Sequence, residues 1–329
     1  MKIAVVILNW NGKELLEKFL PSVITNSPEA TIYVADNAST DDSIAFVKNR
    51  YPEIQIIRNH ENGGYAKGYN DALKQVDADI FVLLNSDVEV TKNWIHPILS
   101  AFEENPDMAA AQPKILDFNK KDTFEYAGAA GGFIDKYAFP YCRGRIFDTL
   151  EKDVGQYDDN AQIFWASGAC LFIRSKDFWE VNGFDEDYFA HQEEIDLCWR
   201  LNARGRKVYC IGASKVYHVG GGTLNSASPQ KAFLNYRNSL FNLYKNRKNQ
   251  IFGTLLVRLI LDGVSGIFYL LKGKPAFTWQ IIRSHFSFYL NLPGMSKKRK
   301  NEASGHVYFN VQNIPYQYFI KKTRYFNDL

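Results

Sequence analysis

Short apolar runs alternate with helical patterns through the first third of the chain, and this alternation constrains the fold most strongly. The runs are short and rich in β-branched residues, and they occupy 3–8, 31–36, 54–59 and 80–85. Between them lie helical patterns at 13–25, 41–50, 66–76 and 93–105. Strands separated by helices predict a mostly parallel central sheet that is covered on both faces. The chain is therefore expected to have an α/β fold.

Polar residues follow three of these predicted strands. The first strand ends in Asn9 and Asn11, the second in Asp36 and Asn37, and the fourth in Asn85, Ser86 and Asp87. Ligands of open α/β sheets bind outside the carboxyl ends of the strands. A single polar strand end would carry little information, but three at one edge of the sheet predict a binding site.

The stretch "LLNSD" at 83–87 places a carboxylate directly after a buried strand. A hard divalent cation takes carboxylate oxygens together with substrate phosphates and needs few protein ligands. Asp87 could hold such a cation if a diphosphate supplied the other oxygens. An Asx-turn explains Asn85 equally well, but it does not explain why the other strand ends are polar.

Glycines open the third helical pattern, in "ENGGYAKGYNDAL" at 61–73. Gly63 and Gly64 would let the backbone approach a ligand, and the N-terminus of the following helix would attract phosphate. Lys67 could reach the same phosphate. The alternatives are an ordinary glycine turn and a surface lysine.

Residues 106–186 give weaker signals. The run 109–116 predicts a strand, and the Gly- and Ala-rich stretch 127–133 is expected to be flexible. Strand character returns at 165–174, and a helix is expected after 175.

A cluster of acids precedes a helical pattern in "YFAHQEEIDLCWRLNARG" at 188–205. Asp196 and Arg200 are spaced to pair on one helix face, which predicts a structural role for Asp196. Glu193 and Glu194 fall in the first turn, where the helix dipole favours acids in any helix. The functional alternative is that one of these two carboxylates faces a cleft as a general base.

His218 follows a short apolar run and precedes three glycines. A lone histidine is more often structural, but imidazole is also a common metal ligand. We therefore expect His218 to be a candidate ligand of the same cation.

Charge divides the chain in two. Residues 231–329 hold 16 Lys and Arg against 3 Asp and Glu, whereas residues 1–230 hold 23 against 33. An acidic body at 1–230 suits a metal site, and a basic, aromatic appendage at 231–329 suits an anionic surface such as a membrane. Nucleic acid is not expected as a partner, because long apolar runs interrupt the basic residues.

The segment 251–271 is long enough to cross a bilayer, but Arg258 and Asp262 lie near its centre. Each would cost about 2.5–3.5 kcal/mol at the bilayer midplane. A helix that lies in the membrane interface is therefore expected, with the basic runs 272–274 and 297–300 near lipid headgroups. A soluble helical appendage is the alternative.

Four cysteines without CxxC spacing indicate free thiols in a reducing compartment. The first apolar run has only six residues and ends at Asn9, which is too short for a signal peptide. The catalytic body is thus expected to be cytoplasmic, peripheral at the inner face of the cytoplasmic membrane.

Taken in order, the segments "VVILNWNG", "VADNASTDDS", "NGGYAKGYN", "LLNSD", "WASGACLFIR", "GFDEDYFAHQEEIDLCWR" and "VYHVGGGT" resemble the family 2 glycosyltransferases. The resemblance covers about residues 1–240 and is greatest to the bacterial rhamnosyltransferase-like branch. It implies the inverting GT-A nucleotide-diphospho-sugar transferase fold, which is Rossmann-like.

The resemblance also implies roles for individual residues. Asp36 matches the residue that binds the nucleotide base, and Asp87 matches the final acid of a DxD-type motif that binds Mg²⁺ or Mn²⁺ through the donor diphosphate. His218 matches a further metal ligand. Glu194 matches the second acid of the family's "ED" pair, which is the catalytic base; Glu193 remains the runner-up. The nucleotide-sugar site would also include Asn9, Asn11, Asn37, Gly63, Gly64, Lys67, Asn70, Asn85, Ser86, Gly168 and Ala169.

Two positions depart from the family pattern. Asn85 replaces the first acid of the DxD-type motif, which removes one charge from the metal site. The "ED" pair is "EE", so the side chain of the base is one methylene longer.

The implied activity is transfer of a sugar from a UDP- or dTDP-linked donor, rhamnose in this branch, to an acceptor hydroxyl with inversion. The acceptor would be a saccharide or a polyprenyl-diphosphate-linked saccharide of a surface polysaccharide, and a homodimer is compatible with the chain. The alternatives are a sugar nucleotidyltransferase and an inactive scaffold that binds nucleotide or sugar. A nucleotidyltransferase typically carries a glycine-rich basic loop after the first strand, which "NWNGKELL" lacks. A scaffold would be expected to have lost the strand-end acids.

Overall fold

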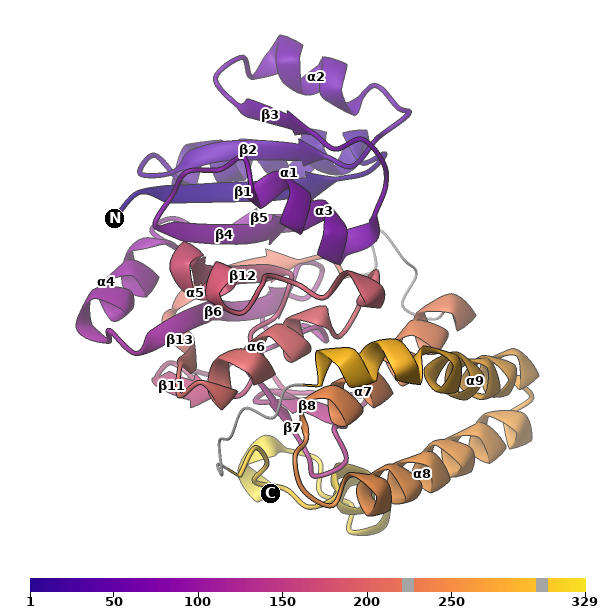
Figure 1. Ribbon diagram of the computed structural model, residues 1–329. Helices are drawn as coiled ribbons and strands as arrows, with labels where there is room; N and C mark the ends of the chain where they lie inside the picture. Colours follow the sequence, from indigo (N-terminus) through magenta and orange to yellow (C-terminus); the bar gives the residue numbers. More distant parts are fainter. Residues whose placement is uncertain (221–227, 300–306) are drawn as a thin grey trace.

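The computed structural model describes residues 1–220, 228–299 and 307–329 (Figure 1). Its described residues form a nine-stranded sheet in the order β11-β13-β6-β12-β4-β1-β2-β3, with β5 paired to β13. The strands of this sheet are β1 (Ile3–Asn9), β2 (Thr31–Asp36), β3 (Gln55–Arg58), β4 (Ile80–Asn85), β5 (Val88–Val90), β6 (Met108–Asp117), β11 (Asn160–Ile163), β12 (Cys170–Arg174) and β13 (Lys207–His218).

Six of these strands, β1, β2, β3, β4, β6 and β13, run in one direction, which confirms the mostly parallel sheet. β12 runs against both of its neighbours, β4 and β6. In the parallel half Asn9 lies opposite Asp36, and Leu8 lies opposite Asn85. The polar ends of three strands therefore meet at one edge of the sheet, as the sequence predicts.

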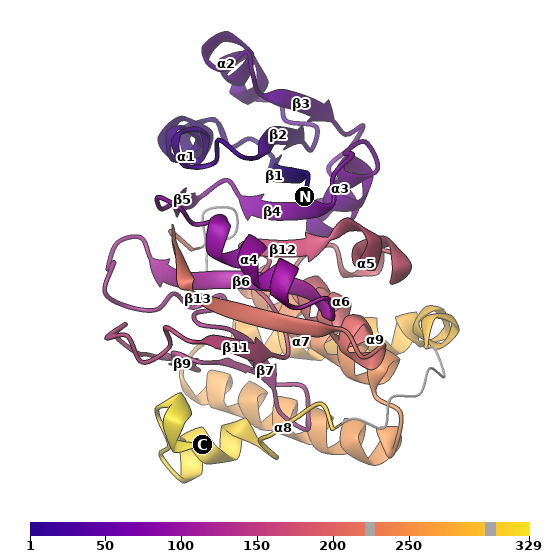
Figure 2. The same ribbon diagram turned by 90° about the vertical axis from the view of Figure 1, so that its left-hand side faces the viewer.

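The central strands of the sheet are almost entirely apolar, so both faces must be covered. Helices cover both faces, and nearly every residue of these strands is buried as a result. The first six helices are α1 (Lys13–Asn26), α2 (Ser43–Arg50), α3 (Gly64–Leu73), α4 (His96–Glu104), α5 (Ser175–Glu180) and α6 (Glu193–Ala203). Helices α1, α2 and α4 contribute to the core on one face, and α3, α5 and α6 contribute to the core on the other. Figure 2 shows α1 and α3 on opposite sides of the strands.

A second, four-stranded sheet lies in the region of weak sequence signals. Its strands are β7 (Gly132–Ile134), β8 (Pro140–Cys142), β9 (Arg145–Ile146) and β10 (Thr149–Leu150). The expectation that 127–133 is flexible is wrong, since Ala129 and Ala130 are fully buried. Gly128 and Gly131 have positive φ, and a Cβ on either would come within 2.4 Å of a neighbouring side chain. These glycines are required for close packing.

Three further helices follow the sheet: α7 (Pro229–Asn246), α8 (Ile251–Leu271) and α9 (Pro275–Lys298). They gather beside the sheet on the side toward which β1 runs (Figure 1). The remaining helical turns are Glu186–Tyr188, Tyr316–Ile320 and Phe326–Asp328. A division at residue 230 stays a prediction, and α7 contacts α6 of the body as well as α8 and α9.

Candidate active site

The ends of β1 and β2 form a polar corner. Asn9 is fully buried, and its Nδ2 donates to Ser43 Oγ at 2.9 Å, to Ser39 Oγ at 3.1 Å and to Asp36 Oδ1 at 3.4 Å. Its Oδ1 has no hydrogen-bond partner among the described residues. Within the described part of the chain, Asp36 accepts two long hydrogen bonds, from Asn9 Nδ2 and from the Ser39 amide, each at 3.4 Å. Its carboxylate can therefore accept further hydrogen bonds from a ligand.

Asn11 and Asn37 shape the loops around this corner. Asn11 has a φ of 51°, and its Oδ1 accepts from the amides of Thr40 and Asp41 at 2.7 and 3.3 Å. Asn37 Nδ2 donates to Asn62 Oδ1 at 2.9 Å and to the Gly64 carbonyl at 3.1 Å. Asn11 thus positions the loop after β2, and Asn37 links β2 to the start of α3.

The second part of the site lies where β4, β5 and β13 meet. β5 pairs with the end of β13, and this pairing brings Asp87 next to His218. His218 Nε2 is 3.1 Å from Asp87 Oδ1 and 3.5 Å from Asn85 Nδ2, and both the histidine and Asp87 are buried. Ser86 lies between the two strand-end residues, near Gly12. The two predicted metal ligands are therefore neighbours.

Glu125 completes this cluster, although sequence reasoning missed it. Its Oε2 is 3.4 Å from His218 Nδ1 and accepts a hydrogen bond from the Ala127 amide at 2.5 Å. Glu125 is one of two acids in the loop after β6 and lies more than 90 residues from the histidine in the chain. No local pattern marks it.

The cluster suits a cation. Burial of the imidazole opposes its protonation, but the carboxylates of Glu125 and Asp87 outweigh burial and raise the pKa of His218 to about 10. A carboxylate on one ring nitrogen of a metal-bound histidine commonly fixes the tautomer that ligates through the other nitrogen. Asp87 and His218 Nε2 therefore fit a divalent cation, with Glu125 behind the ring. No group of three or more His, Cys, Asp or Glu in the described ranges could hold a metal alone.

The third part of the site is the start of α6. Glu193 is buried, its Oε2 has no hydrogen-bond partner within the described chain, and burial together with Glu194 raises its pKa well above the usual range. Glu194 is half-buried, and burial raises its pKa to about 7. A carboxyl that is reachable and titrates near neutrality is suited to general-base chemistry. The geometry therefore favours Glu194 over Glu193.

The loop that presents these glutamates is strained. Phe189, His191 and Gln192 have φ values of 65°, 68° and 74°, a region that side-chain-bearing residues rarely adopt. Asn238 of α7 holds the loop: its buried Nδ2 donates to the carbonyls of Tyr188 and Ala190 at 3.0 Å and of His191 at 2.7 Å. Strain of this kind persists only where the surroundings enforce it, and α7 provides that enforcement.

Lys231, in the first turn of α7, connects the metal side to the glutamates. Burial lowers its pKa, while the charges of Glu125, Asp87 and Glu194 act in the opposite direction. The lysine is thus within electrostatic reach of all three carboxylates. No local sequence pattern marks Lys231, because it lies 106 residues from Glu125 in the chain.

Gly168 and Ala169 also reach the site. The Ala169 carbonyl accepts from the Asn85 amide at 3.0 Å, and the Gly168 carbonyl accepts from Tyr65 Oη at 2.7 Å. A Cβ on Gly168 would lie 2.8 Å from that hydroxyl oxygen. The loop before β12 is thereby fixed between the end of β4 and the start of α3.

Four of the predicted nucleotide-sugar residues contact other parts of the protein: Gly63, Gly64, Lys67 and Asn70. Gly64 has a φ of 76°, and a Cβ there would lie 2.4 Å from the Phe189 carbonyl oxygen, while Gly63 abuts the side chain of Lys67. Lys67 pairs with Asp71 at the surface. Asn70 is buried and donates to the Phe184 carbonyl at 2.9 Å.

The N-terminus of α3 is likewise taken up by the protein. The amides of Tyr65 and Ala66 donate to the Phe189 carbonyl at 2.7 and 3.3 Å, and the Gly64 amide donates to Asn62 Oδ1 at 3.0 Å. These contacts dock the 184–192 loop on this helix end, and a phosphate site there stays a prediction.

Asp196 has the structural role that its spacing predicts. It is fully buried and accepts from Arg200 Nε, while Lys245 Nζ and Asn246 Nδ2 lie on its other oxygen, all at 2.8 Å. Burial opposes its ionisation, but Arg200 and Lys245 prevail and lower its pKa to about 2.

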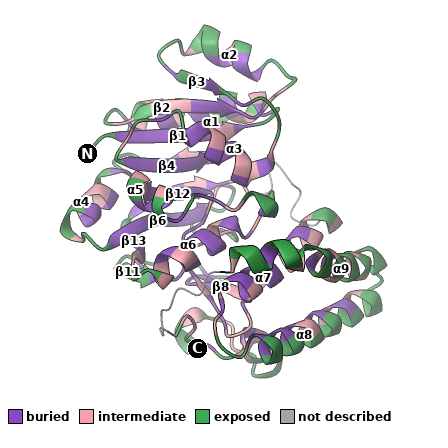
Figure 3. Ribbon diagram, viewed as in Figure 1, coloured by how far each residue is buried: buried purple, intermediate pink, exposed green. Residues whose placement is uncertain are grey.

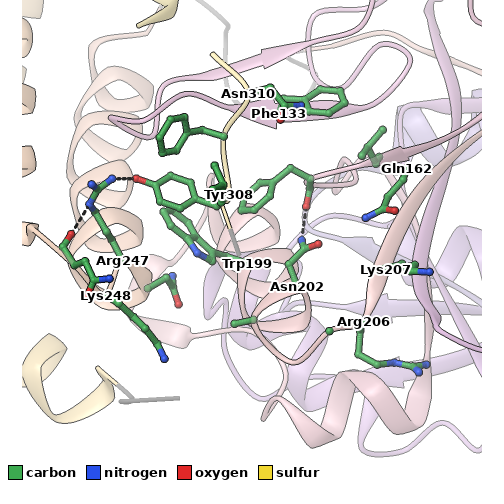
Figure 4. A pocket seen from close by; sticks show the side chains of 18 residues that line it. Phe133, Gln162, Trp199, Asn202, Arg206, Lys207, Arg247, Lys248, Tyr308 and Asn310 are labelled. Carbon is green, nitrogen blue, oxygen red and sulfur yellow. Dashed lines mark hydrogen bonds between the residues drawn. The ribbon is translucent and has the colours of Figure 1, made fainter. Parts of the chain in front are cut away.

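A cavity of about 600 Å³ is lined by residues of α6, of the segment 246–249 and of the segment 307–310 (Figure 4). Trp199 and Tyr308 face each other in it with ring centroids 4.6 Å apart, and Arg247 donates to the Tyr308 hydroxyl. None of the strand-end residues lines this cavity. The candidate active site is assigned from converging side chains at the sheet edge and not from the volume of a cavity.

The α/β sheet thus brings Asn9 and Asp36 together at one strand-end corner and Asp87 next to His218, while Lys231 lies within electrostatic reach of both Asp87 and Glu194. The family model "Glycosyl transferase family 2" matches residues 4–180. The chain belongs to this family and is a glycosyltransferase.

Its curated relatives include bacterial rhamnosyltransferases. An N-acetylglucosaminyl-diphospho-decaprenol L-rhamnosyltransferase of Mycobacterium tuberculosis is 28% identical over 240 residues, which cover 67% of this chain and 77% of the relative. The rhamnosyltransferase WbbL of Escherichia coli is 23% identical over 278 residues, which cover 81% of this chain and 99% of the relative.

Solved structures share the fold. A mannosyltransferase from Pyrobaculum calidifontis, in complex with GDP-Man and Mn²⁺, aligns with a TM-score of 0.55 at 11% identity. The alignment covers 88% of this chain and 87% of the mannosyltransferase. The GT-A fold expected from the sequence is thus confirmed.

Proposed function

We propose that this glycosyltransferase moves a sugar, rhamnose, from a dTDP- or UDP-linked donor to a hydroxyl of a lipid-linked saccharide during synthesis of a surface polysaccharide, with inversion. The two rhamnosyltransferase relatives support the sugar, and the relative whose name contains a diphospho-decaprenol saccharide supports the acceptor. The observation that carries the chemistry is that Lys231 lies within electrostatic reach of both the half-buried Glu194 and Asp87, and burial raises the pKa of Glu194 to about 7.

In this proposal each part of the edge has one task. Asp36 and Asn9 bind the nucleotide. Asp87 and His218 would hold Mg²⁺ or Mn²⁺, which neutralises charge on the leaving diphosphate. Lys231 lies where it can add a second positive charge.

Glu194 acts on the acceptor. Its carboxylate takes the proton of the acceptor hydroxyl as that oxygen attacks the anomeric carbon from the face opposite the leaving group. One displacement inverts the configuration at that carbon. Glu193 is buried, and burial together with Glu194 raises its pKa well above the usual range, which makes it the less suitable base.

The test is a transfer assay with purified enzyme, Mn²⁺, a synthetic polyprenyl-diphosphate N-acetylglucosamine acceptor, and dTDP-rhamnose beside UDP- and GDP-linked hexoses. We expect transfer from dTDP-rhamnose and inverted anomeric configuration of the product by NMR. A product of retained configuration would refute the mechanism, and transfer only from another donor would refute the choice of sugar. Incubation with a sugar 1-phosphate and a nucleoside triphosphate serves as the control for nucleotidyl transfer, for which no product is expected.

A further inference from the structure

Helix α8 buries polar residues and exposes apolar ones, which is the reverse of a surface helix in a water-soluble domain. Its polar residues Thr254, Arg258 and Asp262 are buried. Its outward stripe is apolar and consists of Phe252, Leu256, Ile260, Val264, Ile267 and Leu271. Phe252 and Leu271 are each 83% exposed. Figure 3 shows exposed residues along the outer sides of α8 and α9.

The buried polar residues anchor α8 to the body. Arg258 Nε donates to Asp262 Oδ1 at 2.9 Å, and its Nη1 donates to the Tyr137 carbonyl and to Ser239 Oγ, both at 2.8 Å. His285 of α9 approaches Asp262 Oδ2 at 3.3 Å. The inward face of α8 therefore has its partners, and the apolar face has none within the described residues.

Helix α9 repeats the pattern. Its exposed apolar residues Trp279, Ile282, Phe286 and Leu290 recur at helical spacing. The turn Tyr316–Ile320 extends the apolar surface beside α8, since the rings of Phe268 and Phe319 lie 6.5 Å apart.

Charge identifies what covers this surface. Between residues 231 and 299 the only acidic residue is Asp262, which is fully buried. The exposed charges of α8, α9 and their turn are therefore all positive, and they include Lys272, Lys274 and Lys297. An exposed apolar stripe with a cationic border is complementary to an anionic lipid surface.

We propose that the outward faces of α8 and α9 insert into the headgroup layer of an anionic membrane, so that the enzyme binds peripherally on the cytoplasmic side. Among the described residues, α8 is the one helix that is long and apolar enough to cross a membrane. A crossing would break the hydrogen bonds of Arg258 to Tyr137 and Ser239 and would place two charged residues near the bilayer centre, which is unfavourable. An interfacial position keeps these contacts.

The test uses the full-length protein and co-sedimentation with vesicles of phosphatidylcholine alone or mixed with phosphatidylglycerol. We expect binding to the mixed vesicles that weakens with salt. The triple variant Leu256→Ser/Ile260→Ser/Ile267→Ser should bind at least tenfold more weakly, and Lys272→Gln/Lys274→Gln should lose most of the preference for anionic lipid. Val154→Ser, at an exposed apolar residue of the body, is the matched control and should bind as wild type does.

Three results would overturn the proposal. The first is a failure of the outward face to matter for binding. Wild type would then not bind vesicles, or the triple variant would bind equally well with unchanged circular dichroism. The second is wild-type protein that resists alkaline carbonate extraction, which would indicate a membrane span. The third is an oligomer that the triple substitution dissociates without any vesicle binding, which would make this surface an interface between copies. Because vesicle binding is measured without donor or acceptor, failure of the transferase proposal would leave this result unaffected.

Discussion

Replacing Glu194 by Gln should make the enzyme more stable and nearly inactive. Burial raises the pKa of this carboxyl from 4.5 to about 7. Between these values the folded protein binds a proton that the unfolded chain has released, so its stability falls as the pH rises. At about 1.36 kcal/mol per pH unit, the loss reaches about 3 kcal/mol above pH 7. This figure is an upper bound because Glu194 is partly exposed.

Glutamine stays neutral at every pH and escapes this loss. Glu194→Gln should therefore unfold at the same denaturant concentration as wild type below pH 4.5 and at a higher concentration above pH 7. Its kcat should fall by about 10²–10⁴-fold, the usual contribution of a general base, while the KM for the donor stays unchanged. The wild-type kcat should rise about tenfold per pH unit up to pH 7 and then level off, since the base must be deprotonated.

Urea unfolding from pH 4 to 9 and steady-state kinetics over the same range measure both effects. Glu180→Gln, on exposed surface of α5, is the control and should change neither. The reasoning is refuted if Glu194→Gln retains wild-type kcat, or if Glu193→Gln abolishes the pH dependence while Glu194→Gln preserves it.

Three further changes test the supporting residues. Glu125→Gln should weaken Mn²⁺ binding in the presence of nucleoside diphosphate by about 10–100-fold in calorimetric titration. Loss of a carboxylate behind a metal-bound histidine typically has this effect. Unchanged affinity would place Glu125 outside the metal site. Asn238→Ala should lower kcat more than it changes the donor KM, because the strained loop loses the three hydrogen bonds that Asn238 donates. It should cost about 1–3 kcal/mol in urea unfolding, and an unchanged kcat would contradict the positioning role. Arg258→Met should lower the free energy of unfolding by about 3–5 kcal/mol in urea, because Asp262 is left as a buried charge. The double variant Arg258→Met/Asp262→Leu should recover most of this loss. Equal destabilisation of the double variant would argue against the buried pair.

The sequence predicted the parts of the site that follow directly from strands. Asn9, Asp36, Asn85 and Asp87 could be placed at one edge because parallel strands end together, and the register of β1 with β2 and β4 bears this out. The pairing of Asp196 with Arg200 followed from helical spacing alone.

Other parts depend on contacts between distant segments, which local patterns do not encode. Glu125, Lys231 and Asn238 reach the site only because the loop after β6 and the start of α7 fold back over the sheet edge. The contact that requires a glycine at position 64 is also distant in the chain, since a Cβ there would lie 2.4 Å from the Phe189 carbonyl oxygen. The basic and apolar composition of the C-terminal region indicated a surface role, but only the structure shows that Arg258 and Asp262 face inward.

The central claim is that the edge formed by Asp36, Asp87 and His218 binds a nucleoside diphosphate through a divalent cation. Thermal unfolding of wild type and Asp87→Ala with UDP, dTDP or GDP, each with and without Mn²⁺, tests it most directly. One diphosphate should stabilise the wild type only when Mn²⁺ is present, by about 2.7 kcal/mol at 100 times its Kd, and Asp87→Ala should lose this gain. Stabilisation by no diphosphate under any metal condition, or equal stabilisation of Asp87→Ala, would contradict the claim.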